Sequence, residues 1–511
     1  MKISIITLIL LAFLDLLAAK DINDEKCLII DLETAEKTNN LRMIENIFSD
    51  NASLLYPDST PKCSKEAIIS FYEYLWKNTS IRTIRYENIK IEKIGTQQIE
   101  TGTLMFLNSN RETVELPFKA VIVNNNNKLK IHILALGKDM DLKHTTLKLP
   151  TPTGEYNVAQ SSHYYPKSES TSNRTVSFQL WYPTNPNETK TAVYHSKEVA
   201  RAAAEFMGLP LFFNSYEPLV RTNSYVNAPA VPDTSFPILL YNHGYGGFTS
   251  VYQSVFEDLA SHGYVVVSIA HENESSLFIT ETGEVVRNNP ENDFYRKREP
   301  ELSGPAVNKL QDIILNSDNI KKIEKAYLDL ISLSPLHNES TRLWTKDNKV
   351  VIEKLKEIAK DSPNLRGAFD FENMGIFGHS VGGAVAGQMA FDCPEIDAGI
   401  NLDGFQFGDL VYNKLEIPFM FVSSNQRENS YLRATSLMQN SQNDCYQAII
   451  KGFSHSSFTD LRLFEPGGEE AISLQRELIL IFFNKHLKNL NIDMNEVVDK
   501  YPIIEIIKNN N

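Results

Sequence analysis

The stretch that most constrains the fold is NMGIFGHSVGGAVAG, residues 373–387, in which an apolar run meets a cluster of glycines around Ser380. Its centre, GHSVG, is a G-x-S-x-G motif. The run MGIF before it is typical of a buried strand, and VAGQMAF after it is typical of a helix. A serine between such a strand and helix lies at the tip of a strained turn, where side chains two positions away would collide with the neighbouring backbone. We therefore predict that Ser380 is a nucleophile, in preference to a plain glycine-rich turn.

Short apolar runs on either side of this motif predict a mostly parallel sheet. They are VSFQLWYP, FPILLYNHG and GYVVVSIAH before the motif, and DAGINLDG, IPFMFVSS and CYQAIIKG after it. Near-continuous hydrophobic strands that alternate with helices are typical of a sheet covered on both faces. We expect an α/β domain of the α/β-hydrolase class over residues 148–490. It would carry a charged helical insertion, or cap, at about 275–370 with one weak strand at most, and residues 491–511 would form a C-terminal tail.

Residues 20–138 have a different pattern and predict a small α+β domain, joined to the second domain by a polar linker at 139–147. Residues 31–76 carry apolar side chains at helical intervals, and Ser64 is placed to cap a helix. Period-two runs follow in RYENIKIEKIG, QIETGTLMFLN, ETVELPFKAVIV and KLKIHILAL. Helices followed by an antiparallel meander indicate an α+β unit.

The order of these elements, with the stretch IENIFSDNASLLYPD and the later SKEAIISFYEYL, resembles the SnoaL-like, nuclear-transport-factor-like cone fold. The resemblance implies either an enzyme or a binding or dimerising module. His132, Asp50 and Tyr56 are candidate acid or base groups, but nothing in the sequence places them together. We favour a noncatalytic role for this domain, with an unknown partner.

The beginning of the chain, MKISIITLILLAFLDLLAAK, predicts a signal peptide over residues 1–19 and hence a secreted protein. Its apolar run is shorter than the roughly 20 residues that span a bilayer, which argues against a membrane anchor. An oxidising compartment allows cysteines to pair, and one bridge in each half, Cys27 with Cys63 and Cys393 with Cys445, is the simplest expectation, although sequence leaves the connectivity open. Glycosylation sequons, which support secretion only weakly, occur at Asn51, Asn78, Asn173, Asn187, Asn273 and Asn338.

The 511 residues carry a formal net charge of −14, which argues against a nucleic-acid partner because a polyanion would be repelled. A chain of this length has room for two or more domains.

A nucleophilic serine needs a base and an acid, which follow it in this fold class in the order serine, acid, histidine. Only His455 and His486 follow Ser380. His486 ends an amphipathic helix, where a solvent-facing role near the helix dipole is expected, whereas His455 lies in a loop just past the strand YQAIIKG. For the acid, Asp403 directly ends the strand AGINLD, while Glu428 lies several residues into a later polar loop, so we favour Asp403. Its role would be to orient His455 and stabilise the imidazolium.

An oxyanion intermediate needs backbone N–H donors. One is expected from Val381, directly after the nucleophile, and the second from Tyr245 in the loop of LLYNHGYGGF, which follows an apolar strand. We expect the His243 side chain to brace this loop rather than to take part in catalysis.

The stretches YNHGYGGFTSVYQSVFEDLASHGYVVVSIAHE, IFGHSVGGA, GINLDGFQF, IPFMFVSS and GFSHSSFTD together resemble the secreted, plasma-type platelet-activating factor acetylhydrolases. The resemblance extends over about residues 148–490 and implies a calcium-independent esterase that cleaves short or oxidised acyl chains from the sn-2 position of phospholipids. In that family the acid follows the strand after the nucleophile helix, which also supports Asp403. The first domain and the insertion at 275–370 depart from the family pattern.

Two apolar features could serve a lipid substrate. In SKEVARAAAEFMGLPLFF, the side chains Val199, Ala202, Ala203, Phe206 and Met207 share one helical face, which could contact a membrane or lipoprotein surface or pack on the hydrolase core. Phe405, Phe407 and Phe458 flank the acid and the base and could form walls of an acyl pocket or belong to the core.

The sequence therefore predicts a secreted serine esterase with the triad Ser380, His455 and Asp403 and no metal or organic cofactor. The alternatives are a general carboxylesterase or lipase, a peptidase on the same fold, and an inert secreted protein that binds through its first domain.

Overall fold

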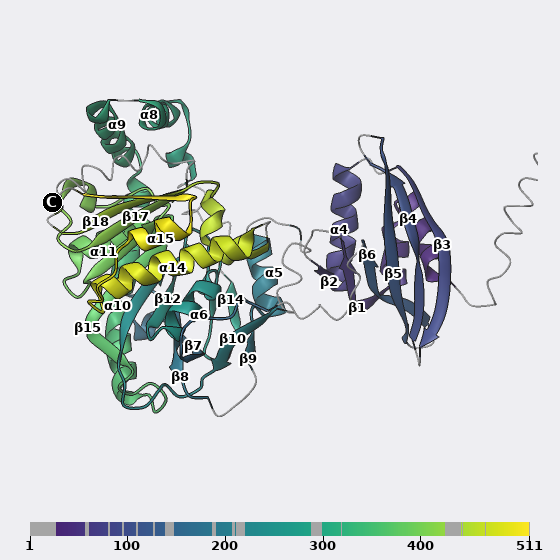
Figure 1. Ribbon diagram of the computed structural model, residues 1–511, viewed down its shortest axis with the longest axis horizontal. Coiled ribbons are helices and arrows are strands. Elements are labelled where there is room, and N and C mark those ends of the chain that lie inside the picture. The colour runs from purple at the N-terminus through teal and green to yellow at the C-terminus, as the bar shows by residue number, and fades with distance from the viewer. Residues whose placement is uncertain are drawn as a thin grey trace, which may run out of the picture. The chain divides into compact units, whose positions relative to one another are not determined.

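The structure is a computed structural model, and its described residues fall into two compact units, 27–137 and nearly all of those from 148 onward (Figure 1). The expected signal peptide and linker lie outside the described residues, as does Glu428. The described ranges are 27–56, 61–79, 82–94, 97–108, 111–125, 128–137, 148–186, 191–206, 210, 220–287, 299–317, 319–424, 441, 443–464 and 467–509.

The first unit packs helices against a mixed sheet. The helices are α2 (Leu28–Lys37), α3 (Leu41–Ile47) and α4 (Lys65–Asn78), and the strands are β1 (Phe48–Leu55), β2 (Lys62–Cys63), β3 (Arg82–Ile94), β4 (Gln97–Leu107), β5 (Thr113–Asn125) and β6 (Lys128–Leu136). Among the described residues the sheet order is β2-β1-β6-β5-β4-β3, and the four strands β3 to β6 form the expected antiparallel meander.

The expectation of an all-helical segment over residues 31–76 is wrong in its middle, because β1 and β2 interrupt it. β1 pairs with β6 in parallel, and its buried Phe48, Ala52 and Leu54 join the core of the unit. Short strands with this little periodicity are hard to separate from helix by pattern alone. The expected cap of α4 is present, since the Ser64 hydroxyl accepts the N–H of Ala67 at 3.2 Å.

The second unit contains a large mixed sheet. Its strands are β7 (Asn157–Tyr165), β8 (Val176–Thr184), β9 (Thr191–Val193), β10 (Arg221–Val226), β11 (Phe236–Asn242), β12 (Val265–His271), β15 (Phe369–His379), β16 (Ala398–Leu402), β17 (Phe419–Ser424), β18 (Cys445–Ile450) and β19 (Ile504–Lys508). Within the described ranges these eleven strands run in the order β19-β18-β17-β16-β15-β11-β12-β8-β7-β10-β9. The six strands from β18 to β12 are mutually parallel, as their near-continuous apolar sequences predict.

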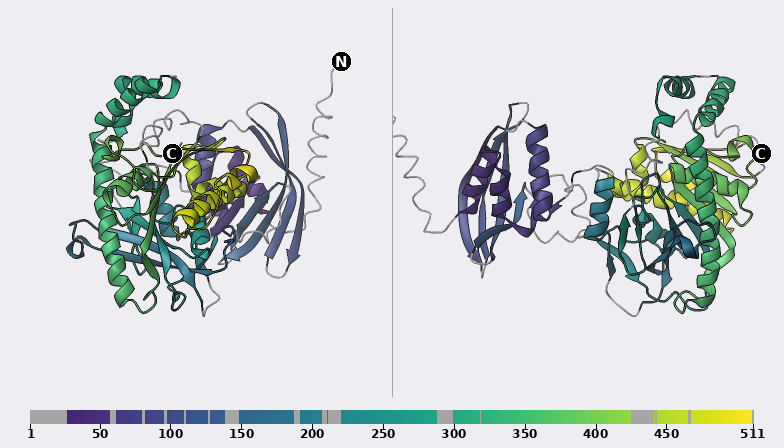
Figure 2. Two further views of the ribbon diagram at one scale, coloured as in Figure 1. Left: turned by 60° about the vertical axis from the view of Figure 1, so that its left-hand side comes forward. Right: turned by 180° about the vertical axis from the view of Figure 1, so that it is seen from behind.

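Helices cover both faces of this sheet. They are α5 (Lys197–Phe206), α6 (Gln253–Ser261), α8 (Pro305–Asn316), α9 (Ile320–Ser332), α10 (Pro335–Asp361), α11 (Val381–Asp392), α14 (Gly468–His486) and α15 (Asn495–Lys500). Figure 2 shows α10 and α14 on opposite sides of the strands. Alternation along β12 accounts for the two layers, since Val265, Val267 and Ile269 join the core under α10 and α11, whereas Val266 joins the core under α6 and α14.

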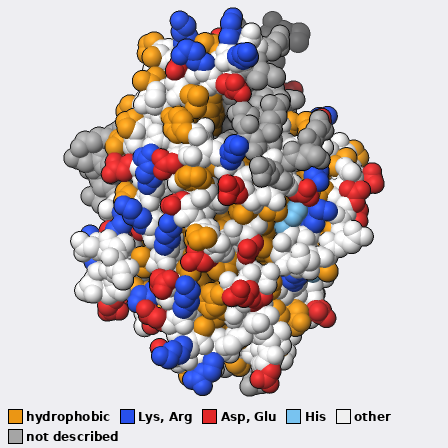
Figure 3. Space-filling view, turned by 90° about the vertical axis from the view of Figure 1, so that its left-hand side faces the viewer, with side chains coloured by type: hydrophobic (Ala, Val, Ile, Leu, Met, Phe, Trp, Pro, Cys, Tyr) orange, Lys and Arg blue, Asp and Glu red, His pale blue; other side chains and the backbone are white. Residues whose placement is uncertain are grey.

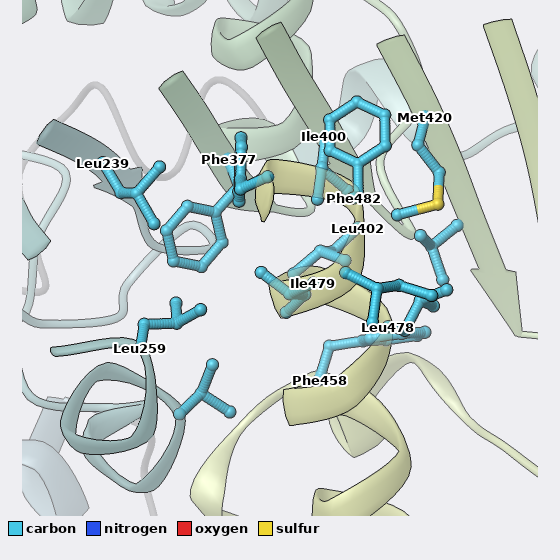
Figure 4. Close-up of a cluster of buried hydrophobic side chains, with 14 of the residues drawn as sticks. Leu239, Leu259, Phe377, Ile400, Leu402, Met420, Phe458, Leu478, Ile479 and Phe482 are labelled. Atoms are coloured by element: carbon cyan, nitrogen blue, oxygen red, sulfur yellow. The ribbon is translucent and has the colours of Figure 1, made fainter. Parts of the chain in front are cut away.

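Figure 4 shows the second of these cores. Side chains from successive parallel strands, among them Phe377, Ile400 and Met420, meet Ile479 and Phe482 of α14, and all of these residues are fully buried. Because adjacent parallel strands end at the same edge of the sheet, this packing fixes where the loops after β15, β16 and β18 lie.

The insertion at 275–370 differs from expectation. Among the described residues of this segment, α8 and α9 form the cap, which projects beyond the end of the sheet in Figure 1. The long α10 belongs to the main domain, because Trp344, Val351 and Leu355 on it are buried in the core under the sheet. Instead of one weak strand, the segment contains the hairpin β13 (Leu277–Ile279) and β14 (Val285–Arg287).

Residues 491–511, expected to form a tail, contribute an element of the main domain. β19 pairs antiparallel with β18 at the edge of the large sheet, from Tyr446↔Lys508 to Ile450↔Ile504. The sequence IIEIIK is too short for its pattern to distinguish an edge strand from a tail.

Neither expected disulfide is formed. Cys27 is a buried free thiol that donates to Oε2 of Glu100 at 3.1 Å, and burial next to that carboxylate raises its pKa to about 12. Cys393 and Cys445 are also buried free thiols, the former donating to Glu395 at the end of α11 and the latter lying in β18.

Surface charges of both signs are interspersed on the face of the second unit in Figure 3, with small groups of hydrophobic side chains between them. Across the described ranges, the search for a helix that could cross a membrane found none of sufficient length and apolarity.

Candidate active site

Ser380 lies between β15 and α11, in the turn that the motif predicts. Its backbone has φ 56° and ψ −119°, a conformation that non-glycine residues rarely adopt, and its N–H donates to the carbonyl of Leu402 at 2.9 Å. Such strain persists only where the surroundings hold it, and it is typical of a nucleophile elbow.

The glycines of the motif allow the close approach that this turn requires. A Cβ on Gly378 would lie 2.2 Å from the carbonyl oxygen of Gly382, and one on Gly382 would lie 2.0 Å from that of Asn242 on β11. Gly404, after β16, has the same function, since its Cβ would lie 2.0 Å from the carbonyl oxygen of Ser380. These contacts press the elbow against two neighbouring strands.

The three residues predicted as a triad are brought together. His455 begins a short 3-10 helix (His455–Phe458) after β18, and its Nε2 lies 3.0 Å from Oγ of Ser380. Its Nδ1 lies 2.6 Å from Oδ2 of Asp403, which directly follows β16. The side chain of Asp403 is fully buried, whereas that of His455 is 39% exposed, so the base can meet a substrate while the acid is shielded from water.

Asp403 is held by a neighbour that sequence reasoning missed. Ser424, the last residue of β17, donates its N–H at 2.9 Å and its hydroxyl at 3.1 Å to Oδ1 of Asp403. Oδ2 is thereby left to face His455. The signal in the sequence is the serine pair that ends FMFVSS, on the strand next to β16.

His379 is a second missed residue, and it occupies the variable position of the motif before Ser380. Its Nε2 donates to the carbonyl oxygen of His455 at 2.9 Å, and the two rings lie 4.6 Å apart. The residue before the nucleophile therefore fixes the loop that carries the base.

The elbow and a neighbouring loop carry the two expected oxyanion donors, Val381 and Tyr245. Val381 is the first residue of α11, where an N–H has no acceptor within the helix. The loop with Tyr245 lies against the elbow, because a Cβ on Gly244 would be 3.3 Å from Cβ of Ser380.

The oxyanion loop rests on a buried polar network. Nε2 of His243 lies 2.7 Å from Oγ of Ser275, and Nδ1 donates to the carbonyl of Gly244 at 2.6 Å. Burial lowers the pKa of His243 to about 3, so its ring is neutral at physiological pH and braces the loop, as expected. The N–H of Gly246 donates to the carbonyl of Glu274 at 2.9 Å.

Glu274 in turn is anchored by the helix beneath it. Its carboxylate accepts hydrogen bonds from Ser340 and from the indole N–H of Trp344, both on α10. Trp344 also stacks on His271, with ring centroids 3.8 Å apart. Helix α10 thus supports the loop that would stabilise the oxyanion.

Of the three phenylalanines expected near the acyl chain, only Phe405 keeps a partly exposed position. It packs with the cap, 6.2 Å from the ring of Tyr327 on α9. Phe407 and Phe458 are 2% and 0% exposed and belong to hydrophobic clusters, which favours the alternative of core packing for these two.

The apolar face of α5 packs inside the second unit. Val199, Ala202 and Ala203 are buried in a cluster with Phe248 and Leu277. A Cβ on Gly246 would lie 2.6 Å from the Phe206 ring, so the end of α5 contacts the oxyanion loop.

The remaining candidates do not join this site. His486 is partly buried against Phe482 and Tyr446 rather than solvent-facing, and burial lowers its pKa to about 4. In the first unit, His132 lies 3.1 Å from Ser49, and Asp50 pairs with Lys65.

The parallel sheet, the elbow and the linked serine, histidine and aspartate are those of an α/β-hydrolase. A solved structure with this fold, a ferulic acid esterase from Streptomyces cinnamoneus, aligns with a TM-score of 0.52 at 18% identity, over 71% of this chain and 99% of that chain. A model of the family described as platelet-activating factor acetylhydrolase, isoform II, matches residues 142–495, and the chain belongs to that family of ester hydrolases.

Curated relatives agree with this assignment. The platelet-activating factor acetylhydrolase of Bos taurus is 24% identical over 378 residues, 66% of this chain and 77% of the relative. That of Cavia porcellus is 24% identical over 326 residues, 62% and 69% of the two chains. That of Gallus gallus is 25% identical over 321 residues, which cover 55% of this chain and 72% of the relative. The predicted family is confirmed, whereas the likeness of the first unit to the SnoaL-like fold stays a prediction.

Proposed function

We propose that this protein is a secreted serine esterase that removes short or oxidised acyl chains from the sn-2 position of phospholipids. The observation that carries the chemistry is the chain of hydrogen bonds from Ser380 through His455 to the buried Asp403, at 3.0 and 2.6 Å. The relatives' name, platelet-activating factor acetylhydrolase, carries the choice of substrate class.

In the proposed reaction, Oγ of Ser380 attacks the ester carbonyl while Nε2 of His455 takes its proton. The oxyanion accepts hydrogen bonds from the N–H groups of Tyr245 and Val381. His455 then protonates the leaving alcohol, and an acyl-enzyme is left on Ser380. A water activated by the same histidine releases the fatty acid, while Asp403 keeps Nδ1 protonated and stabilises the imidazolium.

The acyl chain is proposed to lie toward Phe405. This residue follows the acid by two positions, and the cap holds the segment after it: Tyr327 on α9 accepts the N–H of Gln406 at 2.7 Å.

Secretion and contact with a membrane or lipoprotein surface are further parts of this proposal. Secretion is supported by the signal-peptide pattern of residues 1–19. The proposed surface contact has less support than the sequence suggests, because Val199, Ala202 and Ala203 on the apolar face of α5 are buried. The apolar residues that follow this helix in the sequence, Leu209, Leu211, Phe212 and Phe213, could extend the surface and lie outside the described residues.

The test combines a fluorophosphonate probe with a substrate panel. The intact protein should be labelled, Ser380→Ala should not, and Asp329→Asn, a change on the exposed face of α9, should label as the natural protein does. Hydrolysis should be fastest for a phospholipid with a short sn-2 chain and slow for a long-chain phospholipid. Equal rates on simple esters would favour a general carboxylesterase, and cleavage of peptides would favour a peptidase. An intact protein that is not labelled would sink the enzyme proposal.

A further inference from the structure

The base loop, residues 451–464, carries His455 and also contains a buried carboxylate that the triad does not use. Asp460 begins the 3-10 helix Asp460–Phe464 in this loop, and its side chain is fully buried. A buried carboxylate is costly unless hydrogen bonds and charges compensate it. The groups that hold Asp460 therefore indicate its function.

Asp460 connects the base loop with the first turn of α6, which begins directly after the oxyanion loop. Oδ2 of Asp460 accepts the N–H of Ser254 at 3.0 Å, and Oδ1 accepts the hydroxyl of the same residue. The N–H of Asp460 donates to the carbonyl of Val251 at 3.0 Å. An N–H in the first turn of a helix has no acceptor within the helix, and the helix dipole favours a negative charge there. The carboxylate thus caps α6 from the base loop.

Two further elements of the fold hold this carboxylate. Tyr194, which precedes α5, donates its hydroxyl to Oδ2 of Asp460 at 3.0 Å. Arg476 on α14 favours the ionised form of Asp460 by its charge. The same guanidinium donates to the carbonyl of Ser254, from Nε at 3.1 Å and from Nη2 at 2.7 Å. Segments far apart in the sequence therefore meet at Asp460.

A second bridge joins the same two segments. Gln475 on α14 donates its Nε2 to the carbonyl of Ser457 in the base loop at 3.1 Å, and its Oε1 accepts the hydroxyl of Tyr252 at the start of α6. Phe458, which follows Ser457, is fully buried in the same core as Leu259 of α6 (Figure 4). The base loop is thus fixed to α6 at two points.

We propose that Asp460 is a positioning residue for the esterase reaction, which ties the base loop to α6 and so fixes His455 relative to the oxyanion donor Tyr245. The base and the oxyanion donors act on the same ester group, so a small shift of one loop against the other lowers the rate. This inference rests on the proposed function, because it concerns the rate of that reaction.

The charge of Asp460 makes this role depend on pH. Burial raises the pKa of Asp460 to about 6, although the hydrogen bonds from Ser254 and Tyr194 and the charge of Arg476 oppose this rise. Protonation removes the negative charge at the start of α6 and turns one acceptor oxygen into a donor. The contact between the base loop and α6 should therefore loosen as the pH falls through about 6.

Other titratable groups surround this carboxylate. Tyr241 on β11 and Tyr252 both interact with it, and burial raises the pKa values of both, so they stay neutral from pH 5 to 8. Asp258 on α6 lies 3.7 Å from Nη1 of Arg476. His195 stacks on Tyr194, and its Nε2 lies 3.4 Å from the carbonyl oxygen of Ser250.

The test compares Asp460→Asn with the natural protein in steady-state hydrolysis of a short-chain ester. Asparagine is neutral and close in shape to a protonated aspartate. At pH 8, kcat of the variant should be lower by about fivefold or more, with little change in KM. Between pH 8 and pH 5, the ratio of the two kcat values should shrink about threefold, because the natural carboxyl becomes protonated too. Protonation of His455 affects both proteins and cancels in this ratio, whereas a merely structural defect would leave the ratio constant.

Glu257→Gln is the matched control. Glu257 is a fully buried carboxylate on α6, but it accepts the N–H of Asn223 at 3.0 Å and the hydroxyl of Ser224 at 2.6 Å, and so ties the helix to β10. This variant should keep kcat within about twofold of the natural protein at both pH values. Circular dichroism and thermal unfolding at pH 5 and pH 8 establish that each variant is folded.

Tyr194→Phe is a second variant, which keeps the carboxylate and removes one donor to it. The pKa of Asp460 should rise further, so kcat relative to the natural protein should be nearly unchanged at pH 8.5 and about twofold lower at pH 6.5. This variant decides the question if Asp460→Asn does not fold, and an unchanged pH profile would then count against the proposal.

Two results with folded Asp460→Asn would overturn the proposal: a kcat equal to that of the natural protein at pH 8, or a ratio of kcat values that is the same at pH 5 and pH 8. Fluorophosphonate labelling separates these results from a failure of the proposed function. A natural protein that is neither labelled nor active would refute both proposals, whereas one that is labelled and active leaves only the role of Asp460 to be decided by the variants.

Discussion

Ser424 donates two hydrogen bonds to Oδ1 of Asp403, at 2.9 and 3.1 Å, and so leaves Oδ2 to pair with His455 at 2.6 Å. The aspartate is thus oriented from the neighbouring strand β17 rather than by its own loop. Ser424 is expected to act on the reaction through Asp403, as a positioning residue.

Replacing Asp403 by Asn should lower kcat by about 10⁴-fold, because the amide can stabilise the wrong tautomer of His455. Ser424→Ala removes only the hydroxyl and keeps the backbone donor, so a loss of about two- to tenfold in kcat with little change in KM is expected. Steady-state kinetics on a short-chain ester checks both. A Ser424→Thr variant should restore the rate, and full activity of Asp403→Asn would contradict the assignment of the acid.

The elbow should tolerate no side chain at Gly382. Gly382→Ala places a Cβ 2.0 Å from the carbonyl oxygen of Asn242 and should destabilise the second unit by about 1–3 kcal/mol, with loss of labelling by a fluorophosphonate. Gly283→Ala is the matched control, because a Cβ there meets nothing within 4 Å and only the positive φ of 83° opposes it. Denaturant unfolding compares the two, and equal destabilisation would argue against the crowded elbow.

Trp344 should support the oxyanion loop through Glu274. Trp344→Phe removes the indole donor to a buried carboxylate and should cost about 1–3 kcal/mol of stability and lower kcat more than it raises KM. Trp181→Phe is a close control, since Trp181 is also fully buried but its indole N–H has no hydrogen-bond partner. Similar kinetics for the two variants would show that the contact with Glu274 is not needed for catalysis.

The stability of the first unit should fall as pH rises toward 7. Burial raises the pKa of Glu36 from 4.5 to about 7 in the folded protein, so the folded state binds a proton more tightly than the unfolded state. Glu36 therefore contributes about 2–4 kcal/mol to the free energy of unfolding below about pH 4.5, and this contribution is lost between about pH 4.5 and 7. The difference in stability between Glu36→Gln and the natural protein should therefore be more favourable to the variant at pH 8 than at pH 5. Thermal unfolding at both values measures this, and a pH-independent difference would refute it.

The sequence alone determined much of the catalytic half. Apolar runs without polar interruption specified the parallel strands, and the glycines around Ser380 specified the turn, because both depend on local sterics and burial. The fixed order of chain segments in this fold then led to Asp403 and His455, which the structure brings to Ser380.

Only the tertiary structure decided which residues support those three. Ser424, His379 and Trp344 act through contacts between strands or helices far apart in the chain, and no local pattern encodes such pairings. The same reason applies to β19, whose partner strand is more than 50 residues away in the sequence. It applies to the thiol of Cys27, which contacts Glu100 instead of another cysteine. It also applies to the surroundings of Glu36. The helical periodicity of α2 predicts a buried face, but only the packing of α2 against α4 brings the Glu36 carboxylate to the hydroxyl of Tyr72, which donates to Oε1 at 2.7 Å.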